Sequence, residues 1–152
     1  MTTSLNRTKA PFYQPELSTT LLRITLGLVL LAHSVYLKAV VFTLPGTAQY
    51  FASIGLPSFS AYVVFAVEAI AGIGIVLGYQ TRWLAVSVIP VLIGATWAHS
   101  GNGWLFTNAN GGWEYPVVLV AIALAQIGLG DGKFALGNLQ TKHSHFQPSA
   151  AL

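Results

Sequence analysis

The stretch from Ser60 to Gly78, SAYVVFAVEAIAGIGIVLG, constrains the fold more than any other part of the chain. It is apolar except for one carboxylate, Glu68, and a helix rising about 1.5 Å per residue over this length crosses the core of a bilayer. A carboxylate in hydrocarbon is costly, so we expect Glu68 to face a protein interior or a wet cavity and to have a polar partner. Small residues that share its helical face, Ala61, Ala71 and Gly72, would let another helix approach closely.

Composition extends this conclusion to the whole chain. Of its 152 residues, 54% are hydrophobic and only 7% are charged, and the mean hydropathy is +0.65. Soluble domains carry roughly 25% charged residues, so the chain is predicted to be an integral membrane protein in contact with the lipid bilayer. The basic residues form no stripe of the kind that binds nucleic acid. The absence of cysteine excludes thiolate chemistry within the chain.

Four apolar segments are separated by short polar connections, at residues 20–42, 60–78, 83–99 and 115–130. This pattern predicts an all-α membrane protein, an antiparallel bundle of four transmembrane helices. An open sheet is excluded because its edge groups would go unpaired in lipid.

The polar ends of the chain define its expected organisation. We predict a flexible cytoplasmic arm at residues 1–16, one membrane domain at 17–137 and a disordered cytoplasmic tail at 138–152. A connector follows the first span, with a short amphipathic turn around Ala48–Ile54. The glycine- and asparagine-rich stretch Ser100–Gly112 is predicted to be a loop.

The distribution of basic residues predicts the orientation. Six of the seven lie on one side of the proposed spans, namely Arg7, Lys9, Arg23, Arg82, Lys133 and Lys142, and only Lys38 lies on the other. The positive-inside rule then places both termini in the cytoplasm, as for a multi-pass protein of the bacterial inner membrane. Arg23 and Lys38 lie near opposite ends of the first span, and we expect each to extend to its nearest water interface.

Each predicted span carries one histidine or carboxylate towards the outer half of the bundle: His33, Glu68, His99 and Glu114. His33 lies about 15 Å outward from Arg23, and Glu68 about 12 Å inward from Ser60, so the two residues fall at similar depths and are natural partners. Lys38 follows His33 by five residues, which turns an α-helix by about 140°, so the two should not share a face.

The chemistry of these four residues stays open. Two imidazoles and two carboxylates suit iron, manganese or zinc, but there is no Glu-x-x-His pair of the di-iron type, and metal or haem ligation is disfavoured. A proton-coupled site for a quinone or a similar small molecule competes with a structural network that links the helices. His99 could be a simple interfacial residue, and Glu114 could stabilise the start of its helix. Lys38, Tyr115 and Arg82 are secondary candidates.

The same residues give the chain a resemblance to the DoxX family, extending from about Leu22 to Gly137. Its elements are Arg23 with Gly27, His33 followed by Lys38, FASIGLP at 51–57, EAIAG at 68–72, GYQTR at 78–82, His99, and GWEYP at 112–116. Ser34 departs from the family pattern, in which glycine often follows the histidine.

The resemblance implies a four-helix bacterial inner-membrane protein whose relatives are described as oxidoreductases or as subunits of thiosulfate:quinone oxidoreductase. We therefore expect a membrane component of a redox system that binds a quinone or a sulfur compound, or docks a redox partner protein. One alternative is a non-catalytic membrane scaffold, and another is a small-molecule or proton carrier, which would have to form an oligomer. The resemblance transfers no catalytic role to any residue.

Overall fold

The computed structural model describes residues 14–138, and this part of the chain is helical, without strands. The predicted arm and tail lie almost wholly outside the described residues. The helices, in chain order, are α1 (Pro15–Leu31), the π-helix η1 (Ala32–Val41), α2 (Leu44–Ser53), α3 (Ser60–Leu77), α4 (Thr81–His99), the short 3-10 helix η2 (Ser100–Asn102) and α5 (Glu114–Leu129).

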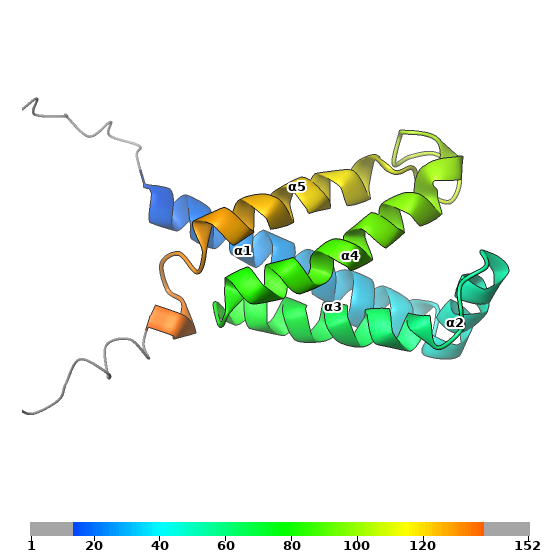
Figure 1. The fold of residues 1–152 in the computed structure, drawn as a ribbon, viewed down its shortest axis with the longest axis horizontal. Helices are drawn as coiled ribbons and strands as arrows, with labels where there is room; N and C mark the ends of the chain where they lie inside the picture. Colours follow the sequence, from blue (N-terminus) through cyan, green and yellow to red (C-terminus); the bar gives the residue numbers. More distant parts are fainter. Residues whose placement is uncertain (1–13, 139–152) are drawn as a thin grey trace, which may run out of the picture.

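The predicted fold class, a helical membrane bundle, is confirmed. Three helical segments are long and apolar enough to cross a membrane: Pro15–Val41, Ser60–Leu77 and Thr81–Asn102. α5 is a shorter apolar helix. The start of α1 and the end of α5 lie at the same end of the bundle, which we call the terminal end (Figure 1). The opposite end, which carries α2 and the loop between α4 and α5, is called the loop end.

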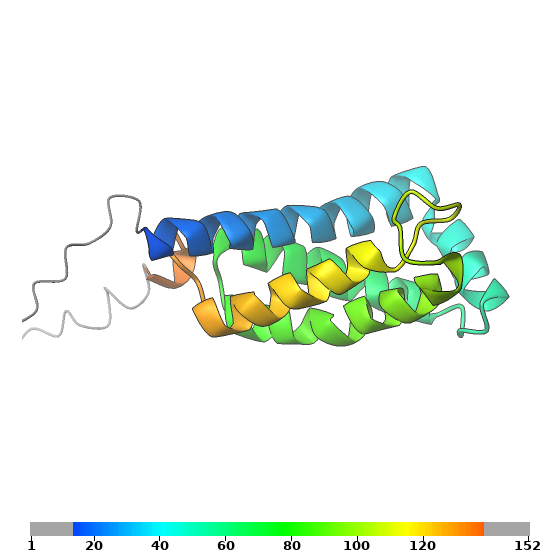
Figure 2. The same ribbon diagram turned by 90° about the horizontal axis from the view of Figure 1, so that it is seen from above.

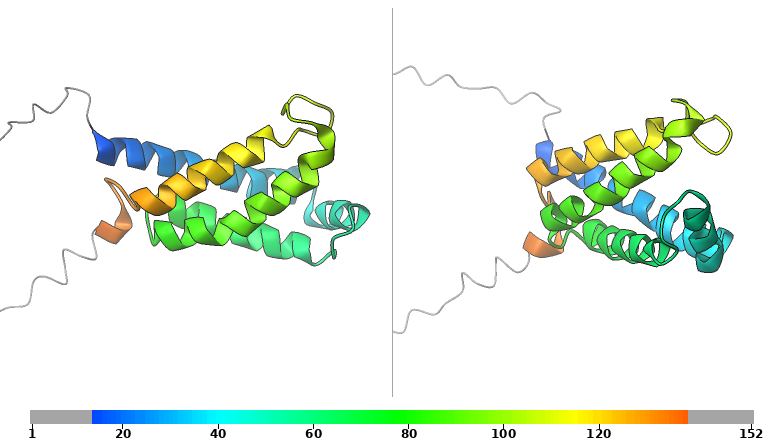
Figure 3. Two further views of the ribbon diagram at one scale, coloured as in Figure 1. Left: turned by 45° about the horizontal axis from the view of Figure 1, so that its top comes forward. Right: turned by 45° about the vertical axis from the view of Figure 1, so that its right-hand side comes forward.

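Two pairs of helices make up the bundle. α1 packs along α3, and α4 packs along α5; the pairs are close together at the terminal end and diverge towards the loop end (Figures 1 and 3). The close packing of α1 on α3 depends on glycine. A Cβ atom at Gly27 would lie 2.6 Å from Cγ2 of Val76, and one at Gly72 would lie 2.9 Å from Cγ of Leu31. The prediction that small residues on the face of Glu68 permit a close helix contact is confirmed.

The first span departs from a regular α-helix at its loop end. α1 continues without interruption into η1, seen at the far end of the blue-to-cyan helix in Figure 2. The hydroxyl of Ser34 donates to the carbonyl oxygen of Leu30 at 2.8 Å, and the N–H of Phe42 donates to the oxygen of Leu37 at 2.8 Å. α2 then begins with Thr43, whose Oγ1 accepts from the N–H of Gly46. The connector therefore holds a helix of ten residues where the sequence predicted only a short turn.

Residues 130–138 cross the terminal end of the bundle and are called the C-terminal strap. The N–H of Lys133 donates to the oxygen of Glu16, and its carbonyl accepts the hydroxyl of Thr20 at 2.7 Å, which joins the strap to α1. The N–H of Gly137 donates to the oxygen of Gly78 at 3.0 Å, which joins it to the end of α3. The strap, which continues from α5, thereby fastens that helix to the terminal ends of α1 and α3.

Candidate functional site

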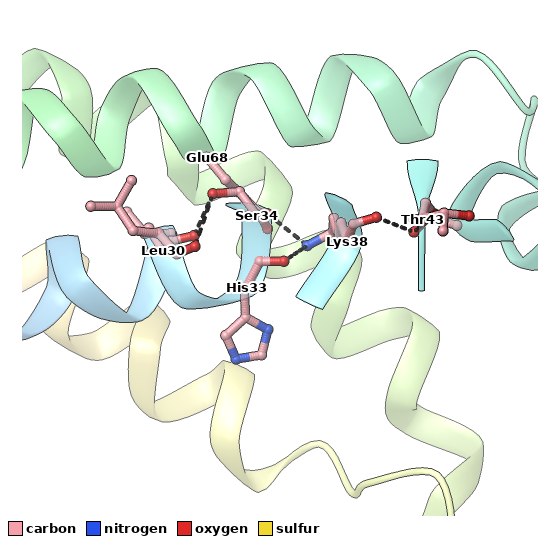
Figure 4. Close-up of polar contacts among 8 residues, drawn as sticks. Leu30, His33, Ser34, Lys38, Thr43 and Glu68 are labelled. Atoms are coloured by element: carbon pink, nitrogen blue, oxygen red, sulfur yellow. Dashed lines mark hydrogen bonds and ion pairs between the residues drawn. The ribbon is translucent and has the colours of Figure 1, made fainter. Parts of the chain in front are cut away.

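Glu68 forms an ion pair inside the bundle with Lys38. Nζ of Lys38 lies 2.6 Å from Oε2 of Glu68, and the two side chains are only 16% and 7% exposed (Figure 4). The same ammonium donates to the carbonyl oxygen of His33 at 3.4 Å. The prediction that Glu68 faces the interior and has a polar partner is confirmed. A buried charge of either sign is tolerated here because its counter-charge is within hydrogen-bond distance.

The partner is Lys38, which was expected to extend to the water interface. His33 was the partner that depth favoured, but any polar side chain met the expectation, and the contacts of residues 14–138 include no hydrogen bond between Glu68 and His33. The side chain of Lys38 reaches back to the main-chain carbonyl of His33 and across to Glu68 on α3. The ring of His33 contacts Tyr115 on α5 instead, so the two side chains lie on different faces, as expected.

α2 supports this arrangement from the loop end. The hydroxyl of Thr47 lies 3.3 Å from the carbonyl oxygen of Lys38 and 2.9 Å from that of Thr43. Thr47 is itself buried. The backbone at Lys38 is thus held by a contact that the sequence did not indicate, because nothing in the pattern placed α2 against η1.

The ring of His33 points away from the ion pair, towards α5 (Figure 4). It stacks on Tyr115, with ring centroids 5.6 Å apart and planes at 24°. His33 therefore connects two parts of the bundle: its carbonyl oxygen contacts Lys38, and its imidazole contacts α5. Lys38 and His99 are both close enough to act electrostatically on the imidazole. Tyr115, a secondary candidate from sequence, joins the cluster through this stack.

His99 holds the loop that follows α4. Its Nδ1 lies 3.1 Å from the carbonyl oxygens of both Asn110 and Gly111. Both oxygens can only accept, so Nδ1 carries the proton in this arrangement. Nδ2 of Asn102 donates to the same two oxygens. This imidazole thus has a structural contact with the loop.

Glu114 also contacts the loop. Its Oε2 accepts the N–H of Phe106 at 3.2 Å, and its own N–H donates to the oxygen of Trp104 at 3.0 Å. Glu114 lies in the first turn of α5, where a negative charge is favoured by the helix dipole. Within residues 14–138, no group of three His, Cys, Asp or Glu side chains could hold a metal ion. The contacts of Glu114 are to the loop and those of Glu68 are to Lys38, so the four candidates do not form one ligand set.

Arg82 and Arg23 lie at the terminal end, away from this cluster. Arg82 is exposed, and its Nη2 contacts the oxygen of Gly128 at 3.5 Å. Arg23 is only 1% exposed, which contradicts the expectation that it reaches water. Its Nη1 donates to the oxygens of Ile75 and Val76, at 3.1 and 3.0 Å, in the last turn of α3. Sequence reasoning missed this role because helix-end acceptors are main-chain groups and leave no side-chain signature.

An open apolar groove of about 640 Å³ lies between α4 and α5 towards the loop end. Its lining consists of Ile93, Thr96, Trp97, Ser100, Trp113, Val117, Val120, Ala121 and Leu124. The hydroxyls of Thr96 and Ser100 are bonded to carbonyls of their own helical turns, so the lining presents hydrocarbon and indole. Tyr115 is two residues from Trp113, about 200° around α5. The groove and the His33 cluster therefore lie on different faces of that helix.

Comparison with known proteins identifies the family. The family model DoxX matches residues 18–101, which include most of α1, all of η1 and α3, and both partners of the ion pair. A protein of Bacillus subtilis (strain 168) named "Putative oxidoreductase CatD" is 36% identical over 113 residues, covering 74% of this chain and 81% of that protein. No solved structure matches the chain. With its four apolar helices and this extent of similarity, the chain belongs to the DoxX family of membrane proteins.

Proposed function

We propose that this DoxX family protein is the membrane component of a redox system and that its ligand, a quinone or a sulfur compound, binds beside the Lys38–Glu68 pair. The observation that carries the proposal is the pair itself, two charges kept within 2.6 Å inside a bundle of apolar helices. Ionisable groups at membrane depth are costly and usually serve a function. The name of the Bacillus subtilis relative, an oxidoreductase, supports the same chemistry.

The pair suits a reaction in which electrons and protons move together, as in the reduction of a quinone. The ammonium of Lys38 can donate a proton to the developing negative charge on a quinone oxygen, and Glu68 can take up a proton from water and pass it to Lys38, which restores the pair. His33 adds an imidazole, the side chain that most readily exchanges protons near neutral pH. In this proposal a redox partner protein supplies or removes the electrons, and Tyr115 holds the imidazole in place by stacking.

The proposal includes the orientation in the bacterial inner membrane. Arg82 lies in the first turn of α4 and Lys133 in the C-terminal strap, both at the terminal end, whereas Lys38 lies in η1 towards the loop end. In the sequence, Arg7 and Lys9 precede the first span and Lys142 follows the last, so they are assigned to the same side as the terminal end. The positive-inside rule then supports cytoplasmic termini and a loop end that faces outward. Residues 17–137 then form the membrane domain, with the remaining residues on its cytoplasmic side.

Quinone binding tests the proposal directly. The protein, purified in nanodiscs, is titrated with a short-chain quinone, and the heat of binding is measured by calorimetry. Glu68→Gln keeps the shape of the side chain and removes its charge; Glu16→Gln makes the same change on an exposed residue of α1 and serves as the matched control. We expect Glu68→Gln to weaken binding about tenfold, equivalent to about 1.4 kcal/mol, and Glu16→Gln to leave it unchanged. Equal affinity in all three proteins would contradict the proposal.

A second candidate function, a scaffold that docks a partner, is favoured by a different observation. His99 and Glu114 both bind the backbone of the loop between α4 and α5, which fixes the loop in one conformation. A rigid loop suits recognition of another protein because less conformational freedom is lost on binding. Co-purification separates the candidates. A stable protein partner without any bound quinone supports the scaffold, whereas quinone bound in the absence of a partner supports the redox component.

A further inference from the structure

Polar side chains are found in two separate parts of the bundle interior. Towards the loop end are Lys38 and Glu68 with the carbonyl of His33. At the terminal end, Arg23 is bonded to the last turn of α3, and Asp131 of the strap lies near enough to act on its charge. Arg23 meets α3 at Ile75, seven residues beyond Glu68, so the two polar groups are separated by about 10 Å along that helix.

The space between them is filled by apolar side chains from all four long helices. The buried core consists of Leu26 and Leu30 from α1, Ala71 and Ile75 from α3, Val88 and Leu92 from α4, and Leu119 and Ala123 from α5. Each of these residues is between 0% and 5% exposed. These apolar side chains offer no polar partners, which water molecules need in order to stay in a protein interior.

The terminal end is closed a second time by the C-terminal strap. Asp131 binds the N–H of Thr81 at the start of α4, and Gln126 of α5 donates to the oxygen of Gly130. Together with the contacts to Thr20 and Gly78, these bonds tie the strap to every long helix. The polar group towards the loop end differs in exposure, because the side chain of Lys38 remains 16% exposed whereas Arg23 is 1% exposed.

We propose that water, protons and the polar head of any ligand reach the Lys38–Glu68 pair from the loop end alone. The apolar core and the strap close the path from the terminal end, so the interior pair belongs to one aqueous side of the membrane. The access of a ligand rests on the proposed function, whereas the access of water and protons does not depend on it. The site then exchanges protons with the side that the loop faces, whichever chemistry it supports.

Single-cysteine labelling tests this sidedness, since the natural chain has no cysteine. Lys38→Cys is made together with Glu68→Gln, which avoids leaving a lone buried carboxylate. A positively charged, membrane-impermeant methanethiosulfonate reagent is added to one face of the membrane at a time, using right-side-out and inside-out vesicles. Phe106→Cys and Arg82→Cys, both exposed residues, mark the loop end and the terminal end respectively. We expect the thiol introduced by Lys38→Cys to be modified on the same side as the Phe106→Cys marker.

We expect the reagent to modify Lys38→Cys about tenfold faster, or more, when it is added on the loop-end side than when it is added on the other side. Ala71→Cys, in the apolar core, should be modified from neither side. The proposal is overturned if Lys38→Cys reacts equally from both sides, reacts from the side of Arg82→Cys, or does not react while both markers do. Because labelling requires no quinone, one-sided labelling together with no quinone binding would remove the proposed function and leave the sidedness intact.

Discussion

Oδ1 of Asp131 accepts the backbone N–H of Thr81 at 3.0 Å, which caps α4 with a side chain from the far end of the chain. The residue that precedes α4, Gln80, makes no side-chain capping bond and has a positive φ of 51°. The first N–H groups of a helix have no partner within it, so this end of α4 depends on the strap. Asp131 thus performs for α4 the function that a local Ser, Thr or Asp usually performs.

Removing this cap should loosen the terminal end. Asp131→Ala is expected to lower the free energy of unfolding by about 1 kcal/mol, because a helix N–H loses its acceptor. Asp131→Asn keeps an oxygen in the same place and should retain most of the stability. Unfolding in mixed micelles with increasing sodium dodecyl sulfate measures both variants. A loss as large for Asn as for Ala would show that charge, and not the cap, is what matters.

Gly78 is expected to tolerate no side chain. It ends α3 with a φ of +70°, and a Cβ there would clash with Arg23 and with Ala135 of the strap. Gly78→Ala should therefore cost more than about 1 kcal/mol of unfolding free energy, from the strained backbone together with the clash. Gly94, within α4, has nothing within 4 Å of its ideal Cβ and provides the control. Gly94→Ala should be neutral or stabilising in the same assay.

The Lys38–Glu68 pair should show strong coupling between its two members. Lys38→Met alone or Glu68→Leu alone leaves a buried charge unpaired. Each single variant is expected to lose about 3–5 kcal/mol of unfolding free energy. The double variant has no buried charge left and should recover much of the loss. A double-mutant cycle of unfolding free energies measures the coupling. If the single losses simply add, the 2.6 Å contact contributes little to stability.

The topology is tested by reporter fusions. A fluorescent protein that folds only in the cytoplasm, fused after Leu152, should fluoresce in cells. Alkaline phosphatase, which is active only outside the cytoplasm, should be active when inserted after Asn108. Both results follow from six of seven basic residues lying on one side of the spans. The opposite pattern would reverse the orientation and with it the side on which the proposed site opens.

The helical bundle and the burial of Glu68 could be predicted because both follow from local composition. A carboxylate in the middle of a long apolar segment must face the protein interior however the helices are arranged, since lipid offers it no partner. The partner itself could not be predicted, because depth along a span does not show which polar side chain of the neighbouring helix faces Glu68. Lys38 was expected to reach water, and its ammonium contacts Glu68 and the carbonyl oxygen of His33 instead.

Depth along a helix was also an incomplete guide to contact. His33 and Glu68 were expected to meet because they lie at similar levels, but the imidazole turns to Tyr115 on α5. His99 and Glu114 were assigned to the outer half of the bundle, and each binds loop backbone at the loop end. Main-chain acceptors such as those of Asn110 and Gly111 are the same in every sequence, so residue type alone does not reveal them.

The C-terminal strap also sets the order in which the protein can complete its assembly. A membrane protein is synthesised from its N-terminus, so α1 with Arg23 enters the bilayer long before residues 130–138 leave the ribosome. Until then Arg23 lacks the oxygen of Phe134, and Thr81 lacks its acceptor on Asp131. The last part of the described chain to be made is therefore the part that fastens the first, and a chain truncated before Gly130 would keep its four apolar helices without the bonds of the strap.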